Sequence, residues 1–155
     1  MMRRMSLGPL LLASVLALPA SAQPGISTFE QAADLVANEG APITLSAPFC
    51  ARFDLACDQT SMKQDTAQSD TVTKSAMVGT FGGGQEMVVL IRRDNDNAKA
   101  ELYVADLFGD LMRGYAMANN GAPSRLTVAE ARAGFEAEKT WWVQWLAQHP
   151  PKAAK

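Results

Sequence analysis

One stretch near the carboxyl end constrains the fold most strongly. The tetrapeptide Thr127-Val128-Ala129-Glu130 has the form of a capping box, in which the threonine hydroxyl and the glutamate carboxylate each accept an N–H left free at the start of a helix. Pro150-Pro151 ends the helix, because proline has no N–H and disfavours helix in the residue before it. The sequence therefore predicts a helix of about five turns between these signals.

This helix is predicted to be amphipathic and to need a surface to pack on. At about 100° per residue, Glu138 lies at the edge of the apolar side and Trp141 beyond its other margin. Glu138 is interpreted as a boundary carboxylate that reaches solvent or an arginine, with a partly buried acid of raised pKa as the alternative. Trp141 is interpreted as a cap on the core edge, with an exposed anchor for a partner as the alternative. The apolar side itself consists of Val128, Ala131, Phe135, Trp142, Trp145 and Leu146.

Upstream of the helix, the pattern predicts β-strands. Residues 87–91 form the most apolar run after the first 22 residues and have strong β character, ended by Arg92-Arg93 and the turn residues that follow. Residues 99–106 alternate, with Ala100, Leu102 and Val104 on one face and Tyr103 on the other. Residues 111–118 are predicted as a further strand, and Asn119-Asn120-Gly121 is a typical hairpin signal.

A rival interpretation joins residues 99–118 into one helix. Leu107, Leu111 and Tyr115 recur at helical spacing, which supports that alternative. However, Gly109 and Gly114 would each cost such a helix about 1 kcal/mol relative to alanine. Strands are therefore the preferred prediction for this segment.

The amino-terminal half is less regular. Ser27-Thr28-Phe29-Glu30 predicts a second capping box, with Ser27 as the N-cap of a short helix over residues 28–38. Residues 42–46 alternate between apolar and polar, as a short strand would. Three further segments complete the pattern: a polar segment over 59–70, predicted as a loop or the surface of a short element, a strand over 72–81 and a glycine-rich hairpin connection over 82–84.

Together these elements predict one α+β domain over residues 23–149. Its sheet is an antiparallel β-meander of about four or five strands, covered on one face by the long C-terminal amphipathic helix, with a short N-terminal helix beside it. Residues 150–155 are expected to form a disordered tail. The chain length suits a single domain with a real hydrophobic core.

Residues 1–22 have the three parts of a secretory signal peptide. Arg3 and Arg4 give a positive region, residues 7–18 an apolar stretch, and Ala20-Ser21-Ala22 a small-residue cleavage site. The apolar stretch is too short to span a bilayer comfortably. We therefore expect a periplasmic or secreted protein, with no membrane insertion once the signal is removed.

Cys50 and Cys57 are the only cysteines, and in an exported chain such a pair predicts a disulfide. Residues seven apart on a straight helix lie about 10.5 Å apart along its axis. A bridge allows roughly 7 Å between the two Cα atoms, so the segment between the cysteines is expected to bend. Thiol redox chemistry and metal binding are the alternatives, but the redox motif Cys-x-x-Cys is not present.

Composition argues against several classes of function. The chain has 14 Lys and Arg against 16 Asp and Glu, interspersed and without a basic stripe, so nucleic-acid binding is not expected. The single histidine, His149, adjoins a proline pair and is poorly placed as a general base. The sequence contains no zinc or haem signature. No metal and no cofactor are therefore expected.

The expected function is non-catalytic binding of a protein or small-molecule partner. The candidate binding residues are three aromatics, an arginine and an acid, types that are common in binding sites: Tyr103, Tyr115, Trp141, Arg113 and Glu138. The alternative is a small hydrolase or isomerase that uses a carboxylate pair in a pocket between sheet and helix. Its candidate acids are Glu101, Asp106 and Glu138.

Overall fold

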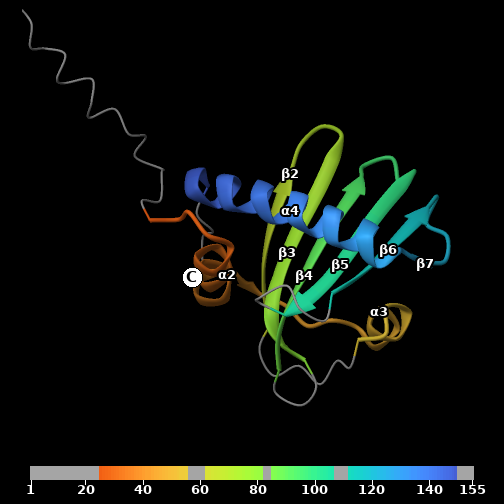
Figure 1. Cartoon of the computed structure of the whole chain (residues 1–155), viewed down its shortest axis with the longest axis horizontal. Coiled ribbons are helices and arrows are strands. Elements are labelled where there is room, and N and C mark those ends of the chain that lie inside the picture. Colours follow the sequence, from red (N-terminus) through yellow and green to blue (C-terminus); the bar gives the residue numbers. More distant parts are fainter. Residues whose placement is uncertain (1–24, 56–61, 82–84, 107–111, 150–155) are drawn as a thin grey trace, which may run out of the picture.

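The computed structural model describes residues 25–55, 62–81, 85–106 and 112–149. Its centre is one antiparallel sheet of seven strands, in which every strand pairs with its neighbours in the chain. The strands are β1 (Ala41–Pro42), β2 (Met62–Gln68), β3 (Val72–Phe81), β4 (Gln85–Asp94), β5 (Lys99–Asp106), β6 (Arg113–Ala118) and β7 (Ser124–Arg125). The helices are α2 (Phe29–Glu39), α3 (Ala47–Arg52) and α4 (Val128–Gln148), and α4 crosses the sheet (Figure 1).

The predicted α+β meander with a long C-terminal helix and a short N-terminal helix is confirmed, but the number of strands is larger than predicted. The additional strands are short or polar. β1 and β7 have two residues each, and β2 carries only two buried residues, Met62 and Ala67. Such strands give almost no apolar alternation, which is the signal that identifies a strand in a sequence.

The sheet has a buried cluster on each face, because alternate residues of a strand point to opposite sides. On one face, Val88, Leu90 and Tyr103 pack with residues of α2 and α4. On the other face, Val89 and Leu102 pack with Cys50 and Phe53 from α3 and the residue that follows it. The face that holds α2 and α4 is called the helix face below, and the other the α3 face.

Helix α4 begins at the predicted capping box. The Thr127 N–H donates to Glu130 Oε1 at 3.0 Å, and the Glu130 N–H donates to Thr127 Oγ1 at 3.1 Å. The predicted stripe is correct except at Val128, whose side chain is 69% exposed. Val128 lies in the first turn, ahead of the first buried residue of the helix. The buried positions are Ala131, Phe135, Glu138, Trp142 and Leu146.

The N-cap of α2 is Thr28 and not Ser27, so the helix starts one residue later than predicted. Gln31, rather than Glu30, closes the capping box. Its side-chain oxygen accepts the N–H groups of both Ser27 and Thr28, at 2.8 and 3.1 Å. The Gln31 side chain thus satisfies two backbone donors that precede the helix.

Residues 99–106 and 113–118 form strands, so the preferred interpretation of this segment is confirmed. Gly114 is needed there because an added Cβ would lie 2.9 Å from Cδ1 of the Tyr103 ring. The predicted hairpin after β6 is also present. Asn119 and Asn120 have φ values of 53° and 61°, a left-handed conformation that asparagine tolerates, and the Gly121 N–H donates to Ala118 O at 2.8 Å.

The structure changes three of the predicted segment boundaries. The strand predicted over 42–46 is limited to β1, because Ser46 instead caps α3 by accepting the Phe49 N–H at 3.2 Å. The polar segment over 59–70, for which a loop was preferred, contains β2 from Met62 to Gln68 and so matches the alternative of a short element. β4 continues through Arg92 and Arg93 to Asp94, because both arginines keep their ladder partners in β3 and β5.

Several predictions fall outside the described residues. These are the signal peptide over 1–22, the glycine connection over 82–84 and the tail over 150–155. The predicted disulfide between Cys50 and Cys57 belongs with them, because Cys57 lies outside the described residues. They stay predictions. In the described part of the chain, none of the helices combines the length and apolar character needed to span a membrane.

A candidate binding groove beside helix α4

A row of charged side chains crosses the helix face of the sheet. Lys74 of β3 pairs with Arg92 of β4, and Arg92 pairs with Glu101 of β5. Their neighbours two residues along, Ala76, Leu90 and Tyr103, belong to the core under α4. Because the side chains of a strand alternate, the charged row lies on the same face as that core.

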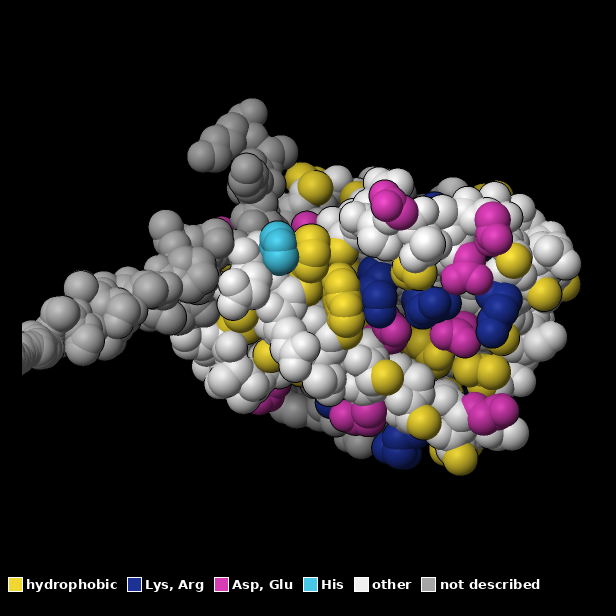
Figure 2. Space-filling model, turned by 90° about the horizontal axis from the view of Figure 1, so that it is seen from above, with side chains coloured by type: hydrophobic (Ala, Val, Ile, Leu, Met, Phe, Trp, Pro, Cys, Tyr) yellow, Lys and Arg dark blue, Asp and Glu magenta, His cyan; other side chains and the backbone are white. Residues whose placement is uncertain are grey.

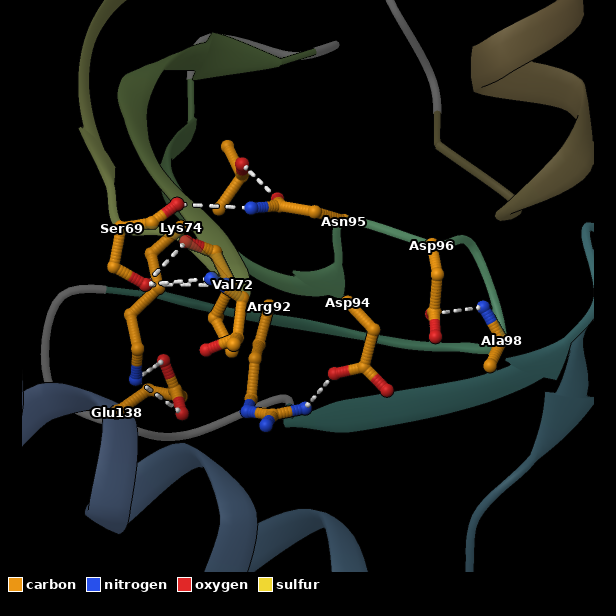
Figure 3. A network of polar contacts seen from close by, with 11 residues as sticks. Ser69, Val72, Lys74, Arg92, Asp94, Asn95, Asp96, Ala98 and Glu138 are labelled. Carbon is orange, nitrogen blue, oxygen red and sulfur yellow. Dashed lines mark hydrogen bonds and ion pairs between the residues drawn. The ribbon is translucent and has the colours of Figure 1, made fainter.

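Lys74 forms an ion pair with Glu138 of α4. Its Nζ lies 3.0 and 3.2 Å from the two carboxylate oxygens, and the lysine and glutamate side chains are only 14% and 9% exposed (Figure 3). Glu138 does find a cation, as one interpretation expected, but the cation is a lysine and the carboxylate is buried. The pair joins the sheet to α4 with both charges largely withdrawn from water.

Three aromatic rings, two from the last turns of α4 and one from its C-cap residue His149, stack at intervals of four residues. The ring centroids of Trp141 and Trp145 are 5.3 Å apart at 11°, and those of Trp145 and His149 are 3.7 Å apart at 10°. Residues four apart lie on the same helix face, which makes the stack possible. Lys74 Nζ lies 4.4 Å from the Trp141 ring centroid, within the range of a cation–π contact. Trp141, Trp145 and His149 are called the aromatic ladder below.

A groove of about 370 Å³ lies between the aromatic ladder and the charged row. Trp141 and Trp145 form one wall, and Lys74 and Arg92 lie on the sheet side. The β2–β3 hairpin contributes the remaining lining residues, Ala67, Gln68, Ser69 and Val72. Figure 2 shows hydrophobic side chains next to the histidine, followed by a row of Lys and Arg side chains. Apolar walls with a few polar groups are typical of small-molecule sites.

The cation at the open side of the groove is Arg92. Its Nη1 lies 3.2 Å from Asp94 Oδ1, and the two side chains are 31% and 26% exposed. One carboxylate contact leaves most of the five N–H donors of a guanidinium available. Arg92 is therefore better placed than Lys74, whose ammonium already bonds both oxygens of Glu138, to bind an incoming anion.

The hairpin that bounds the groove is held by its own hydrogen bonds (Figure 3). Ser69 Oγ accepts the Val72 N–H at 3.1 Å, and Asn95 Nδ2 donates to Ser69 O at 2.9 Å. Thr73 Oγ1 donates to Asn95 Oδ1 at 2.6 Å. These contacts connect the β2–β3 turn to the β4–β5 turn, so the rim is fixed by two hairpins.

Tyr103 lies buried beneath α4 and fixes the distance between helix and sheet. Burial raises the pKa of its phenol, and the neighbouring Glu101 carboxylate raises it further. A Cβ added at Gly134 of α4 would overlap the Tyr103 ring. Gly134, the weakest helix former of α4, is therefore explained by the close approach of Tyr103.

Asp65 of β2 lies near the far end of the aromatic ladder. Burial raises the pKa of its carboxyl group, and hydrogen bonds from the Thr66 N–H and the Trp145 side chain partly offset this effect. The positive field of His149 acts in the same direction as these bonds. The net effect on Asp65 is a raised pKa, with burial as the largest cause.

The five predicted binding residues are not brought together. Trp141 lines the groove, Glu138 is buried against the groove residue Lys74, and Tyr103 lies beneath the helix. Arg113 and Tyr115 lie on the α3 face, where they hold the turn after α3: the Tyr115 hydroxyl donates to Phe53 O at 3.2 Å, and Arg113 Nη2 donates to Asp54 O at 2.8 Å.

Of the eight residues that line the groove, only Trp141 was predicted as a site residue; the other seven, among them Lys74, Arg92 and Trp145, were not. Alternation within each strand gives no register between β3 and β4, so the sequence did not show that Lys74 and Arg92 share one face under α4. Among the candidate acids, Glu138 faces Lys74 rather than a second carboxylate. Glu101 lies beside Tyr103, and Asp106 lies half-buried at the end of β5.

The described residues contain no group of three or more histidine, cysteine, aspartate or glutamate side chains that could hold a metal ion. No protein-family model matches the chain, and neither a curated protein nor a solved structure matches it significantly. Function is therefore inferred from the groove itself.

Proposed function

We propose that the chain is an exported, non-catalytic binding domain. Its ligand is a small organic anion with a flat apolar body, held in the groove beside α4. The observation that carries this proposal is the position of Trp141 and Trp145 opposite Arg92 and Lys74 around a groove of about 370 Å³. That volume lies at the lower end of the range for small-ligand sites, about 300–1,000 Å³.

Each part of the ligand has a matching part of the groove. The flat body packs against the exposed surfaces of the two tryptophans and Val72, where burial of apolar area supplies the driving force. The anionic group binds Arg92, whose planar guanidinium can donate two parallel hydrogen bonds to a carboxylate. The Ser69 and Gln68 side chains at the hairpin end add polar contacts.

The surroundings of Glu138 favour binding over acid–base catalysis. Both carboxylate oxygens accept hydrogen bonds from Lys74. A carboxylate-pair hydrolase or isomerase needs a second acid across the site, and a lysine stands at this position. The buried ion pair instead provides a rigid support for the groove wall.

Intrinsic fluorescence tests the proposal directly, because the three tryptophans of the chain are all in α4. Titration with benzoate is expected to change the emission in a saturable manner, whereas the neutral analogue benzamide binds at least several-fold more weakly. Arg92→Gln is expected to weaken benzoate binding about tenfold, the effect of losing one charge-assisted contact of about 1.4 kcal/mol.

The control variant is Arg132→Gln, which makes the same charge change at an exposed position of α4 outside the groove. It should bind benzoate like the wild type. Equal binding of benzoate and benzamide, or equal weakening by both arginine variants, would show that the groove does not recognise an anion.

A further inference from the structure

A second, smaller cavity lies on the α3 face, opposite the groove. Its volume is about 180 Å³. Phe49 and Phe53 form the wall on the side of α3, and the sheet contributes an apolar floor of Ile91, Leu102 and Met117. This cavity is called the α3 cleft below.

Two arginines line the α3 cleft. Arg52 of α3 is already engaged, because its Nη2 donates to Gly121 O at 2.6 Å and its guanidinium lies 5.8 Å from the Phe53 ring centroid. Arg93 of β4 is exposed. Among the described residues, no hydrogen bond or ion pair engages its guanidinium.

Arg93 and the groove cation Arg92 are consecutive residues of one strand. Because the side chains of a strand alternate between faces, Arg92 lines the groove and Arg93 lines the α3 cleft. β4 thus supplies one cation to each side of the sheet, and the two sites share no lining residue.

We propose that the α3 cleft binds a short straight-chain monocarboxylate. Its alkyl chain packs against Ile91, Leu102 and Met117, and its carboxylate pairs with Arg93 at the mouth. An apolar cavity of about 150 Å³ is large enough for benzene, so the α3 cleft has room for an alkyl chain of about six carbons. Asn97 and Asn120, which also line the cleft, add amide donors near the carboxylate.

The turn after α3 supports this role. Asp54 has a left-handed φ of 55°, and its carbonyl accepts the Arg113 Nη2 hydrogen bond at 2.8 Å. The rings of Phe53 and Tyr115 pack edge to face, 5.4 Å apart. The phenylalanine wall of the cleft is thereby fixed to the sheet before a ligand arrives, which lowers the entropic cost of binding.

Calorimetric titration with sodium hexanoate tests the proposal. The full-length mature chain is expected to bind hexanoate in a saturable manner, and hexanol more weakly. Arg93→Gln should weaken hexanoate binding about tenfold, whereas Arg92→Gln, with the same charge change on the other face, should leave it unaltered. Ala100→Leu, which fills the cleft from β5, should also weaken binding if its circular dichroism shows a native fold.

The two sites are tested separately by this design. Hexanoate binding that survives Arg92→Gln supports the α3 cleft even if benzoate fails at the groove. Three results would overturn the proposal. They are hexanoate binding that fails to saturate, an Arg93→Gln variant that binds hexanoate as tightly as the wild type, and a loss of binding that Arg92→Gln causes instead.

Discussion

The Lys74–Glu138 pair carries the closest charge contact between the sheet and α4. Two charges that are largely buried and paired are expensive to separate. Glu138→Leu and Lys74→Met each leave one buried charge without its partner. We expect each to lower the free energy of unfolding by about 3–5 kcal/mol, measured by urea denaturation. The double variant Lys74→Met/Glu138→Leu removes both charges and should recover most of the loss. Equal losses in single and double variants would contradict a coupled pair.

Replacing Gly134 with alanine should lower the stability of the fold, although helix propensity alone predicts a gain. Alanine is favoured over glycine in a helix interior by about 1 kcal/mol. Because a Cβ at this position would overlap the Tyr103 ring, Gly134→Ala is expected instead to destabilise the fold by about 1–3 kcal/mol, measured by thermal denaturation. In a Tyr103→Leu background the same change should become stabilising. A more stable Gly134→Ala single variant would show that Tyr103 can move away.

Asp65 should give a pH-dependent effect of predictable sign. Its pKa is raised in the folded protein, mainly by burial, so the folded state favours the protonated form. The carboxylate therefore reduces stability above the unfolded pKa of 3.8, and this cost disappears as the pH falls below that value. Asp65→Asn, which keeps an oxygen for the Thr66 N–H, should be more stable than the wild type at pH 7 and equal to it at pH 3. Urea denaturation at both pH values measures the difference in stability between the variant and the wild type. A variant that is stabilised more at pH 3 than at pH 7 would contradict the raised pKa of Asp65.

Among the secondary-structure elements, α4 was predictable and β2 was not. The start of α4 depends on four consecutive residues that make local hydrogen bonds, so its signal lies within the sequence window. β2 is mostly polar, and only Met62 and Ala67 of its seven residues are buried, so its sequence has almost no apolar alternation. Its strand character comes from a seven-residue ladder with β3, a contact that no local pattern contains.

The groove was predictable only in part for the same reason. Trp141 and Trp145 lie on neighbouring turns of one helix, so their stacking follows from helical spacing. Lys74 and Glu138 are 64 residues apart in sequence, and their meeting depends on how α4 crosses the sheet. The direction in which a helix lies on a sheet is set by packing of the whole core, which residue types alone do not reveal.

The capping box of α4 should contribute measurably to the stability of the helix. Thr127→Ala removes the oxygen that accepts the Glu130 N–H and is expected to cost about 1 kcal/mol. The matched control is Thr140→Ala, since the Thr140 hydroxyl is exposed and bonds only to the Glu136 carbonyl one turn back; that change should be close to neutral. Guanidinium denaturation compares the two, and equal losses would argue against a special role for the cap.

For the whole molecule, export and cysteine oxidation belong to one prediction. The signal pattern over 1–22 and the Cys50–Cys57 pair together imply a mature chain that starts at Gln23 and carries a disulfide. Protein recovered from the periplasm should therefore have the mass of residues 23–155 less about 2 Da, and should gain that mass on reduction. A protein that still carries residues 1–22 would contradict export. A mass that does not change on reduction would contradict the disulfide.

The two faces of the sheet carry two separate cavities, and consecutive residues of one strand line them. Arg92 serves a groove walled by tryptophan, and Arg93 serves a cleft walled by phenylalanine. The ligands proposed for them differ in shape: a flat ring for the groove and a slim chain for the cleft. Neither site needs a covalent step, so both are tested by binding alone.

The most direct measurement is a two-dimensional ¹H–¹⁵N spectrum of the tryptophan indole groups during titration with benzoate. Only three indole signals exist. Trp141 and Trp145 line the groove, whereas Trp142 is fully buried and its indole nitrogen has no acceptor among the described residues. We predict that the Trp141 and Trp145 signals shift together and saturate, while the Trp142 signal moves least. Unchanged Trp141 and Trp145 signals at saturating benzoate would contradict the groove as the binding site.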